Sequence, residues 1–131
     1  MFPLQTTIVG MNFRPAECRA RYAMLVPGEM LMLEREPTNA FDPNAIKVLA
    51  APEPEAVDYA AELGDPPPEP RFIAYIPKVH AVNVAPVMDA GQRVRCMVIH
   101  LPNVVELSIE EDRVEPKAEP EVLQATAPNE N

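Results

Sequence analysis

Proline placement is the feature that most restricts how this 131-residue chain can fold. Six of its 17 prolines lie in Ala51–Pro70, and proline has no backbone N–H to donate to a strand ladder, so this segment cannot form the interior of a sheet. We expect a solvated insertion there, with at most a short helical turn at Ala56–Leu63. From Glu110 onward, many charges and three prolines indicate an acidic, mostly disordered tail. The length then predicts one domain at residues 1–111 followed by a tail at 112–131.

The net charge of −9 is unevenly distributed along the chain. Ala51–Pro70 holds six acidic and no basic residues, and Val104–Asn131 holds eight acidic and two basic residues, so each segment carries −6. The rest of the chain carries +3. Overall acidity normally argues against binding to phosphate-rich nucleic acid. Here the acidity belongs to two appendages, which we expect to repel phosphate, and the body is mildly basic.

Short segments with β-branched residues or apolar-polar alternation recur between these appendages, as strands require. The expected strands are Leu4–Val9, Met30–Arg35, Ala45–Ala50, Arg71–Pro77, Arg93–Leu101 and Val104–Glu110. Helix signals are fewer. Pro77–Gly91 should be helical but broken by Pro86 into two short pieces, and Pro15–Leu25 should add one turn. The sequence therefore predicts a mainly β fold, a small six-stranded OB-like barrel with one or two short helices.

The sequence lacks the motifs that are typical of several classes of function. Cys18 and Cys96 are isolated, without metal-ligand spacing, which favours small core residues over a disulfide. The chain contains no apolar run that could span a membrane and does not begin like a signal peptide, so we expect a cytoplasmic protein. No phosphate-binding loop or nucleophile motif occurs either. We expect a non-catalytic protein without cofactor or metal.

The order of several motifs resembles a known family. The segments "IVGMNF", "VPGEMLMLEREPTNAFDPNAIKV" and "IAYIPKVHAVNVAPVMDAG" are similar to the HIRAN domain over roughly Thr6–Gly91 without the insertion. The most specific string runs from Gly28 to Val48. HIRAN domains occur at the N-terminus of helicase-like DNA repair enzymes and as stand-alone proteins. The resemblance implies an OB-like barrel that, in the repair enzymes, captures the 3′ end of single-stranded DNA.

The resemblance also implies a set of DNA-binding residues. Phe13 and Phe41 would stack on bases, Asp42 would accept a hydrogen bond from a terminal 3′-hydroxyl, and Lys78 would contact a phosphate. A carboxylate suits the hydroxyl because it accepts hydrogen bonds and repels a phosphate. One position departs from the family pattern. Where the DNA-binding members have an arginine on the first loop this chain has Asn12, and Arg14 is a possible substitute.

Each of these residues also has a structural interpretation. Asp42-Pro43-Asn44 is a good turn sequence, since an aspartate can bond the amide two residues on. Phe13 and Phe41 could belong to the core, Lys78 could be an ordinary surface lysine, and Asn39 is expected to bond loop backbone.

Two functions therefore remain open. The first is binding of single-stranded DNA with preference for a 3′-hydroxyl end, alongside a possible DNA-processing protein partner. The second is a protein-interaction factor whose acidic segments bind a basic partner surface, with imitation of DNA charge as one way to do so.

Overall fold

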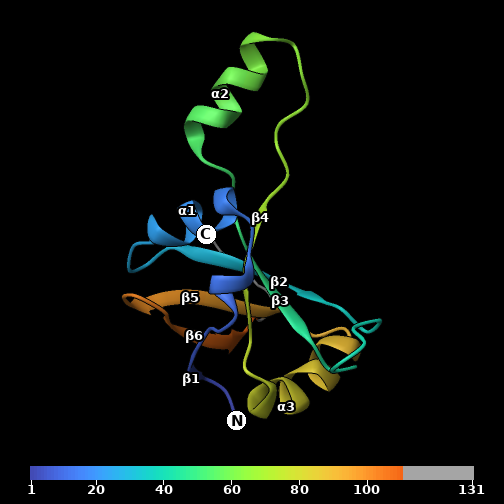
Figure 1. The fold of residues 1–131 in the computed structure, drawn as a ribbon. Helices are drawn as coiled ribbons and strands as arrows, with labels where there is room; N and C mark the ends of the chain where they lie inside the picture. Colours follow the sequence, from blue (N-terminus) through green and yellow to red (C-terminus); the bar gives the residue numbers. More distant parts are fainter. Residues whose placement is uncertain (111–131) are drawn as a thin grey trace, which may run out of the picture.

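Six antiparallel strands form one curved sheet in the computed structural model, which describes residues 1–110 (Figure 1). The strand order is β1-β6-β5-β2-β3-β4. The bounds are β1 Leu4–Thr7, β2 Met30–Arg35, β3 Ile46–Ala50, β4 Arg71–Tyr75, β5 Val94–His100 and β6 Val104–Ile109. All six predicted strands are present, and β2 has the expected bounds. The predicted tail at 112–131 lies outside the described residues.

The two edge strands of this sheet meet just beyond the end of β1. Val9 and Tyr75 exchange backbone hydrogen bonds of 2.9 and 2.8 Å, which join the chain after β1 to β4. This single bridge joins the two ends of the curved sheet and brings it round on itself. The OB-like barrel expected from the sequence is confirmed.

The helices differ from the sequence-based expectation. A 3₁₀ turn, η1, covers Met11–Phe13, and the α-helices are α1 Ala16–Ala23, α2 Pro54–Glu62 and α3 Lys78–Asp89. There are thus three α-helices rather than one or two in the part that the structure describes. In α2, Pro54 occupies the first turn, where a missing N–H costs nothing. The insertion therefore carries a full nine-residue helix rather than one turn, and Figure 1 shows it projecting away from the barrel.

Pro86 does not break α3, contrary to the sequence-based expectation. The helix runs continuously through it over twelve residues. A proline withholds a donor from the carbonyl four residues earlier, here that of Val82, whose exposed side chain lies on the solvent side of the helix. Water can therefore satisfy that carbonyl, and the helix ends only three residues after the proline.

The core lies inside the barrel and under α3. Its largest fully buried side chains come from β3, β4, β5 and β6, from α3 and from the segment after β1; they include Ile8, Ile46, Ile73, Val84, Val98 and Leu107. From α3, Ala81, Val84 and Ala85 pack onto this cluster and fix the helix across the barrel. Cys18 and Cys96 are buried free thiols, as predicted. The position of α3 brings its first residue close to the Val9–Tyr75 contact.

Candidate nucleic-acid interface

A cavity of about 720 Å³ opens beside the Val9–Tyr75 contact. Its lining includes four of the residues implied by the family resemblance, which come from three separate places in the chain: Phe13 from η1, Phe41 and Asp42 from the loop between β2 and β3, and Lys78 from the start of α3. Val9, Asn39, Ala45, Tyr75 and Ile76 complete the lining. The fold therefore brings together Phe13 and Lys78, which are 65 positions apart in the sequence.

The loop between β2 and β3 is organised by the side chain of Asn39. Its Oδ1 accepts hydrogen bonds from the backbone N–H groups of Phe41 and Asp42, at 2.9 and 3.0 Å. Its Nδ2 donates to Glu36 Oε1 at 2.8 Å. A short polar side chain that bonds nearby backbone is typical of Asn in loops. The prediction that Asn39 bonds loop backbone is confirmed. These bonds fix the backbone positions of Phe41 and Asp42 within the loop.

Glu36 and Tyr75 connect this loop to the barrel. The Tyr75 hydroxyl donates to Glu36 Oε1 at 2.7 Å, across the gap between the loop and β4. The hydrogen bonds from Asn39 and then from Tyr75 lower the pKa of Glu36 below its ordinary value, because they favour the carboxylate. Burial, and then the bond to Glu36, raise the pKa of Tyr75. Tyr75 thus lines the cavity as a neutral phenol, and the ionised carboxylate of Glu36 to which it is bonded lies behind the lining.

The carboxylate of Asp42 has one oxygen bonded in the turn and one that is unbonded among residues 1–110. Oδ1 accepts from the backbone N–H of Asn44 at 2.9 Å, and the Ala45 N–H donates to the Asp42 carbonyl at 3.0 Å. The structural interpretation of Asp42 as a turn residue is therefore confirmed. Oδ2 has no hydrogen-bond partner within residues 1–110. Since a carboxylate has about four lone-pair sites, Asp42 can hold the turn and still accept a bond from a ligand.

Phe13 and Phe41 are almost fully exposed. Their side chains are 89% and 91% accessible, the highest values among the large apolar residues described. The alternative that they belong to the core is therefore wrong. An exposed aromatic ring at the rim of a cavity offers a flat face on which any base can stack. Phe13 comes from η1 and Phe41 from the loop between β2 and β3, and both line the same cavity.

Lys78 begins α3 at the edge of the cavity and is exposed. Pro77 precedes it as the N-cap, without a side-chain hydrogen bond to the first turn. The first backbone N–H groups of a helix have no partner within the helix, and this end carries a partial positive charge. The N-terminus of α3 and the ammonium group of Lys78 together make this edge of the cavity suitable for binding a phosphate.

Asn12 and Arg14 do not line the cavity. Asn12 is exposed within η1. Arg14 turns toward β4, where its Nε donates to the Phe72 carbonyl at 3.0 Å and its guanidinium lies 3.6 Å from the centre of the Phe72 ring. These contacts fasten η1 to the barrel. The structure thus places Arg14 as a support beneath Phe13 rather than as a member of the cavity.

Arg35 is a further supporting residue that sequence reasoning missed. Its guanidinium donates to the carbonyl oxygens of Ala45 and Pro43, at 2.8 and 3.0 Å, and forms an ion pair with Asp89 at 2.9 Å. It therefore attaches both the turn after Asp42 and the end of α3 to β2. No local sequence signal reveals this role, because Asp89 is 54 positions away. Tyr75 was missed for the same reason, since its place depends on pairing with Val9.

The acidic insertion lies far from the cavity. The cavity contacts the end of β4 at Tyr75, whereas the insertion joins the start of β4 at Arg71. The four residue steps from Arg71 to Tyr75 span about 13 Å, beyond the screening length of about 8 Å at physiological salt. Repulsion of phosphate by the insertion should therefore be weak at the cavity.

No helix within residues 1–110 has the length and apolar character needed to cross a membrane. In the same range, His, Cys, Asp and Glu side chains form no group of three or more that could hold a metal ion.

Comparison with known proteins gave one family and two similar folds. A model of the family described as "HIRAN domain" matches residues 1–115. A crystal structure of the HIRAN domain of human HLTF is 19% identical with a TM-score of 0.56, covering 81% of this chain and 73% of that one. A crystal structure of a protein from Lactobacillus plantarum is 23% identical with a TM-score of 0.55, covering 79% and 91%. At these identities the structural likeness concerns the fold. No curated protein matched the sequence.

Proposed function

This chain belongs to the HIRAN domain family, and we propose on that basis that it is a non-catalytic module that binds single-stranded DNA and prefers a free 3′-hydroxyl end. HIRAN homologues are known as DNA-binding modules. The preference for a 3′-hydroxyl end is the expectation that follows from the family resemblance, and the cavity around Asp42 supports it.

The free oxygen of Asp42 is the observation that carries this proposal. One carboxylate oxygen is occupied by the turn, and the other has no partner in the described residues. A terminal 3′-hydroxyl can donate to it, whereas the interior of a strand has no hydroxyl at that position. A 3′-phosphate would bring negative charge beside the carboxylate and be repelled. A single residue thereby distinguishes a hydroxyl end from a phosphorylated end and from a continuous strand.

The remaining lining residues suit the rest of a terminal nucleotide. Phe13 and Phe41 expose nearly their whole rings beside the cavity, where bases can stack. Lys78 and the first turn of α3 offer positive charge for a backbone phosphate. The volume of about 720 Å³ falls within the range of about 300–1,000 Å³ typical of small-ligand sites. Stacking on an aromatic ring and contact with a phosphate do not depend on which base is present, so we expect little base specificity.

Titration of end-modified oligonucleotides tests the proposal. The 5′-labelled strands of one sequence carry a 3′-hydroxyl or a 3′-phosphate, and a circular strand provides an oligonucleotide without ends. Fluorescence anisotropy at low salt should give tightest binding to the 3′-hydroxyl strand, because only it can donate to Asp42. Equal affinity for the three would rule out end recognition. Binding to none of them would rule out the DNA-binding proposal itself.

One observation favours the second function, a protein-interaction factor. The acidic residues Glu55, Asp58 and Glu62 of α2 are all exposed and lie three and four positions apart, which puts them on one face of the helix. Exposed Tyr59 and Leu63 lie beside them. A helix of this kind, projecting from the barrel, could bind a basic partner surface. Charge reversal of the three acids should abolish such a contact and leave oligonucleotide affinity within about twofold, because the cavity lies beyond the screening length.

A further inference from the structure

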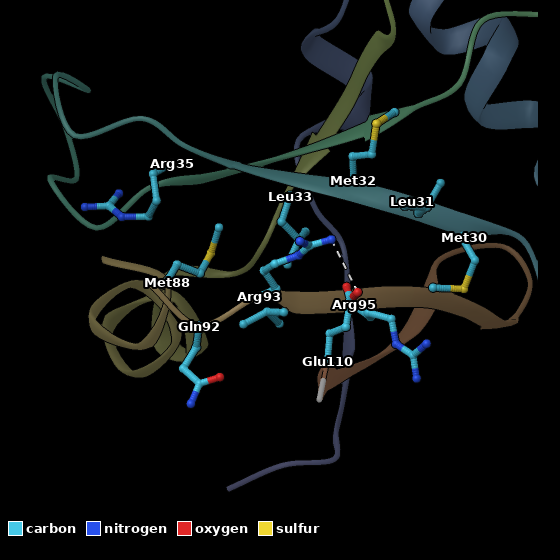
Figure 2. Close-up of a pocket in the computed structure, with 11 residues that line it drawn as sticks. Met30, Leu31, Met32, Leu33, Arg35, Met88, Gln92, Arg93, Arg95 and Glu110 are labelled. Atoms are coloured by element: carbon cyan, nitrogen blue, oxygen red, sulfur yellow. Dashed lines mark hydrogen bonds and ion pairs between the residues drawn. The ribbon is translucent and has the colours of Figure 1, made fainter. Parts of the chain in front are cut away.

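The barrel has an opening between β2 and β5. The pairing between these two strands ends where Leu31 lies opposite Cys96. Beyond that point Met32–Arg35 pair with β3, while Val94 and Arg95 pair with β6, so the two strands diverge. Figure 2 shows the resulting space, a groove of about 450 Å³ closed at one side by the end of α3. We call it the β2–β5 groove; it shares no lining residue with the cavity around Asp42.

The groove combines an apolar surface with arginines. Met30, Leu33, Met88 and Val94 supply the apolar part, and Met30 is 48% exposed. Leu33 of β2 and Arg93, which directly precedes β5, both line the groove, and Arg93 pairs with Glu110 at 3.3 Å (Figure 2). Arg95 points along the outer surface and has no ion pair within residues 1–110. Such a surface fits an extended segment that carries both apolar and acidic side chains.

We propose that Glu119–Leu123 of this same chain binds in the β2–β5 groove. Glu110, the last described residue, itself lines the groove, so the chain continues from the groove's own rim. Leu123 is thirteen positions beyond Glu110, and thirteen steps of extended chain span about 43 Å. The segment can therefore reach every part of the groove. Its attachment also makes the contact intramolecular, so that even individually weak interactions suffice to populate it.

The chemistry of the segment matches the groove. Val122 and Leu123 are the only adjacent pair of large apolar side chains in residues 111–131, and Glu119 and Glu121 precede them closely. The apolar pair would cover Leu33 and Met88, and a glutamate would pair with Arg95. Residues 111–131 carry six acidic and two basic side chains, so their net charge is opposite to that of the groove, whose lining holds three arginines and one glutamate. This proposal is independent of DNA binding.

A spin label on the full-length chain tests whether the segment lies in the groove. Ala125→Cys provides the attachment point. Both native thiols are buried, and burial raises the pKa of Cys96 to about 12, so the introduced cysteine should react selectively at neutral pH. Broadening by the nitroxide should remove most of the intensity of the Leu33 and Val94 amide signals and spare Leu63 on α2. Unchanged intensities at Leu33 and Val94 would overturn the proposal.

Matched variants of the labelled chain test the contacts. Leu123→Asp should abolish the broadening, while Thr126→Asp, which adds the same charge outside the segment, should retain it. Arg95→Glu and Glu121→Arg should each weaken the broadening, and the double variant should restore it, since the exchanged charges attract again. Mixing labelled protein with ¹⁵N-enriched unlabelled protein checks whether a second copy supplies the segment. Broadening of the unlabelled copy, or retention of broadening in Leu123→Asp, would overturn the proposal.

Discussion

Arg35 and Asp89 form an ion pair that joins β2 to the end of α3. The Nε of Arg35 lies 2.9 Å from Asp89 Oδ1, and its other nitrogens donate to the carbonyl oxygens of Pro43 and Ala45 (the Arg35 side chain is labelled in Figure 2). The Arg35 side chain is mostly buried at 15% exposure, whereas Asp89 is exposed at 55%. The turn that carries Asp42 is therefore held from behind by a side chain that is absent from the cavity lining.

Replacement of Arg35 by Lys should weaken both stability and binding of a 3′-hydroxyl strand. Lysine keeps the charge but lacks the planar set of donors that reaches several acceptors at once. Bonds from charged groups are worth about 1.5–3 kcal/mol, so we expect a loss of roughly that size in the free energy of unfolding. Because the Asp42 turn loses its support, affinity should fall several-fold. Urea unfolding and anisotropy titration measure the two effects.

Asp89→Asn is the matched control for Arg35. It retains the geometry and removes only an ion pair whose acid is more than half exposed, so it should cost less than about 1 kcal/mol of unfolding free energy. Equal effects of the two variants would contradict the role given to the Pro43 and Ala45 contacts.

Glu36→Gln should change how stability depends on pH. Hydrogen bonds from Asn39 and Tyr75 lower the pKa of Glu36 in the folded protein below its ordinary value of 4.5. Its contribution to stability is therefore complete above pH 4.5 and is lost as pH falls through the lowered pKa. The difference in Tm between wild type and variant should be largest near pH 7 and shrink below pH 4.5. Thermal melts from pH 7 to pH 3 measure it, and a constant difference would show that the carboxylate gains nothing from these bonds.

Phe41→Ala and Phe13→Ala should separate stability from binding. Both rings are almost fully exposed, so their removal should leave the Tm nearly unchanged. Stacking of a base on an aromatic ring is worth about 1–3 kcal/mol, so each variant should bind single-stranded DNA more weakly by that amount. Phe41→Tyr should preserve binding, because it keeps the aromatic face.

Leu63→Ala is the control for these two substitutions. It removes an exposed apolar side chain from α2, away from the cavity, and should change neither Tm nor affinity. Loss of stability in Phe41→Ala, or unchanged affinity in both phenylalanine variants, would contradict the stacking role.

The strands could be predicted from sequence because their signals are local. Apolar and polar side chains alternate in Val104–Ile109 because successive side chains of a strand point to opposite faces of the sheet. Ile46–Ala50 also contains the β-branched residues that favour strands. The helices were less predictable because the cost of a proline depends on its surroundings. Pro86 withholds a donor only on the exposed side of α3, and Pro54 stands where no donor is needed. The sequence does not show which side of a helix faces water.

The cavity was predictable in part. Phe13, Phe41, Asp42 and Lys78 followed from the family resemblance, and Asn39 followed from the tendency of asparagine to bond loop backbone. Tyr75, Glu36 and Arg35 were missed because each acts through a partner that is distant in sequence. Closure of the barrel creates these contacts, and local patterns contain no information about it. The divergence of β2 from β5 is a tertiary feature of the same kind.

Asp42→Asn provides the sharpest test of end recognition. Asparagine has a side-chain oxygen that can accept the hydrogen bond from the Asn44 N–H, so the turn should persist and the Tm should change little. Its neutral amide accepts less strongly from a 3′-hydroxyl than a carboxylate does. The affinity for a 3′-hydroxyl strand should fall by about 1.5–3 kcal/mol, roughly ten- to a hundredfold.

The same variant should also change discrimination between the two ends. A 3′-phosphate is repelled by the wild-type carboxylate but not by the amide, so its affinity should rise relative to the 3′-hydroxyl strand. Asp42→Ala separates the two roles of this side chain, because it loses the Asn44 bond and should lower the Tm whatever the ligand. Anisotropy titrations with both strands and thermal melts of both variants give the answer. If Asp42→Asn discriminates between the ends as the wild type does, while Asp42→Ala is unstable, Asp42 serves the turn alone.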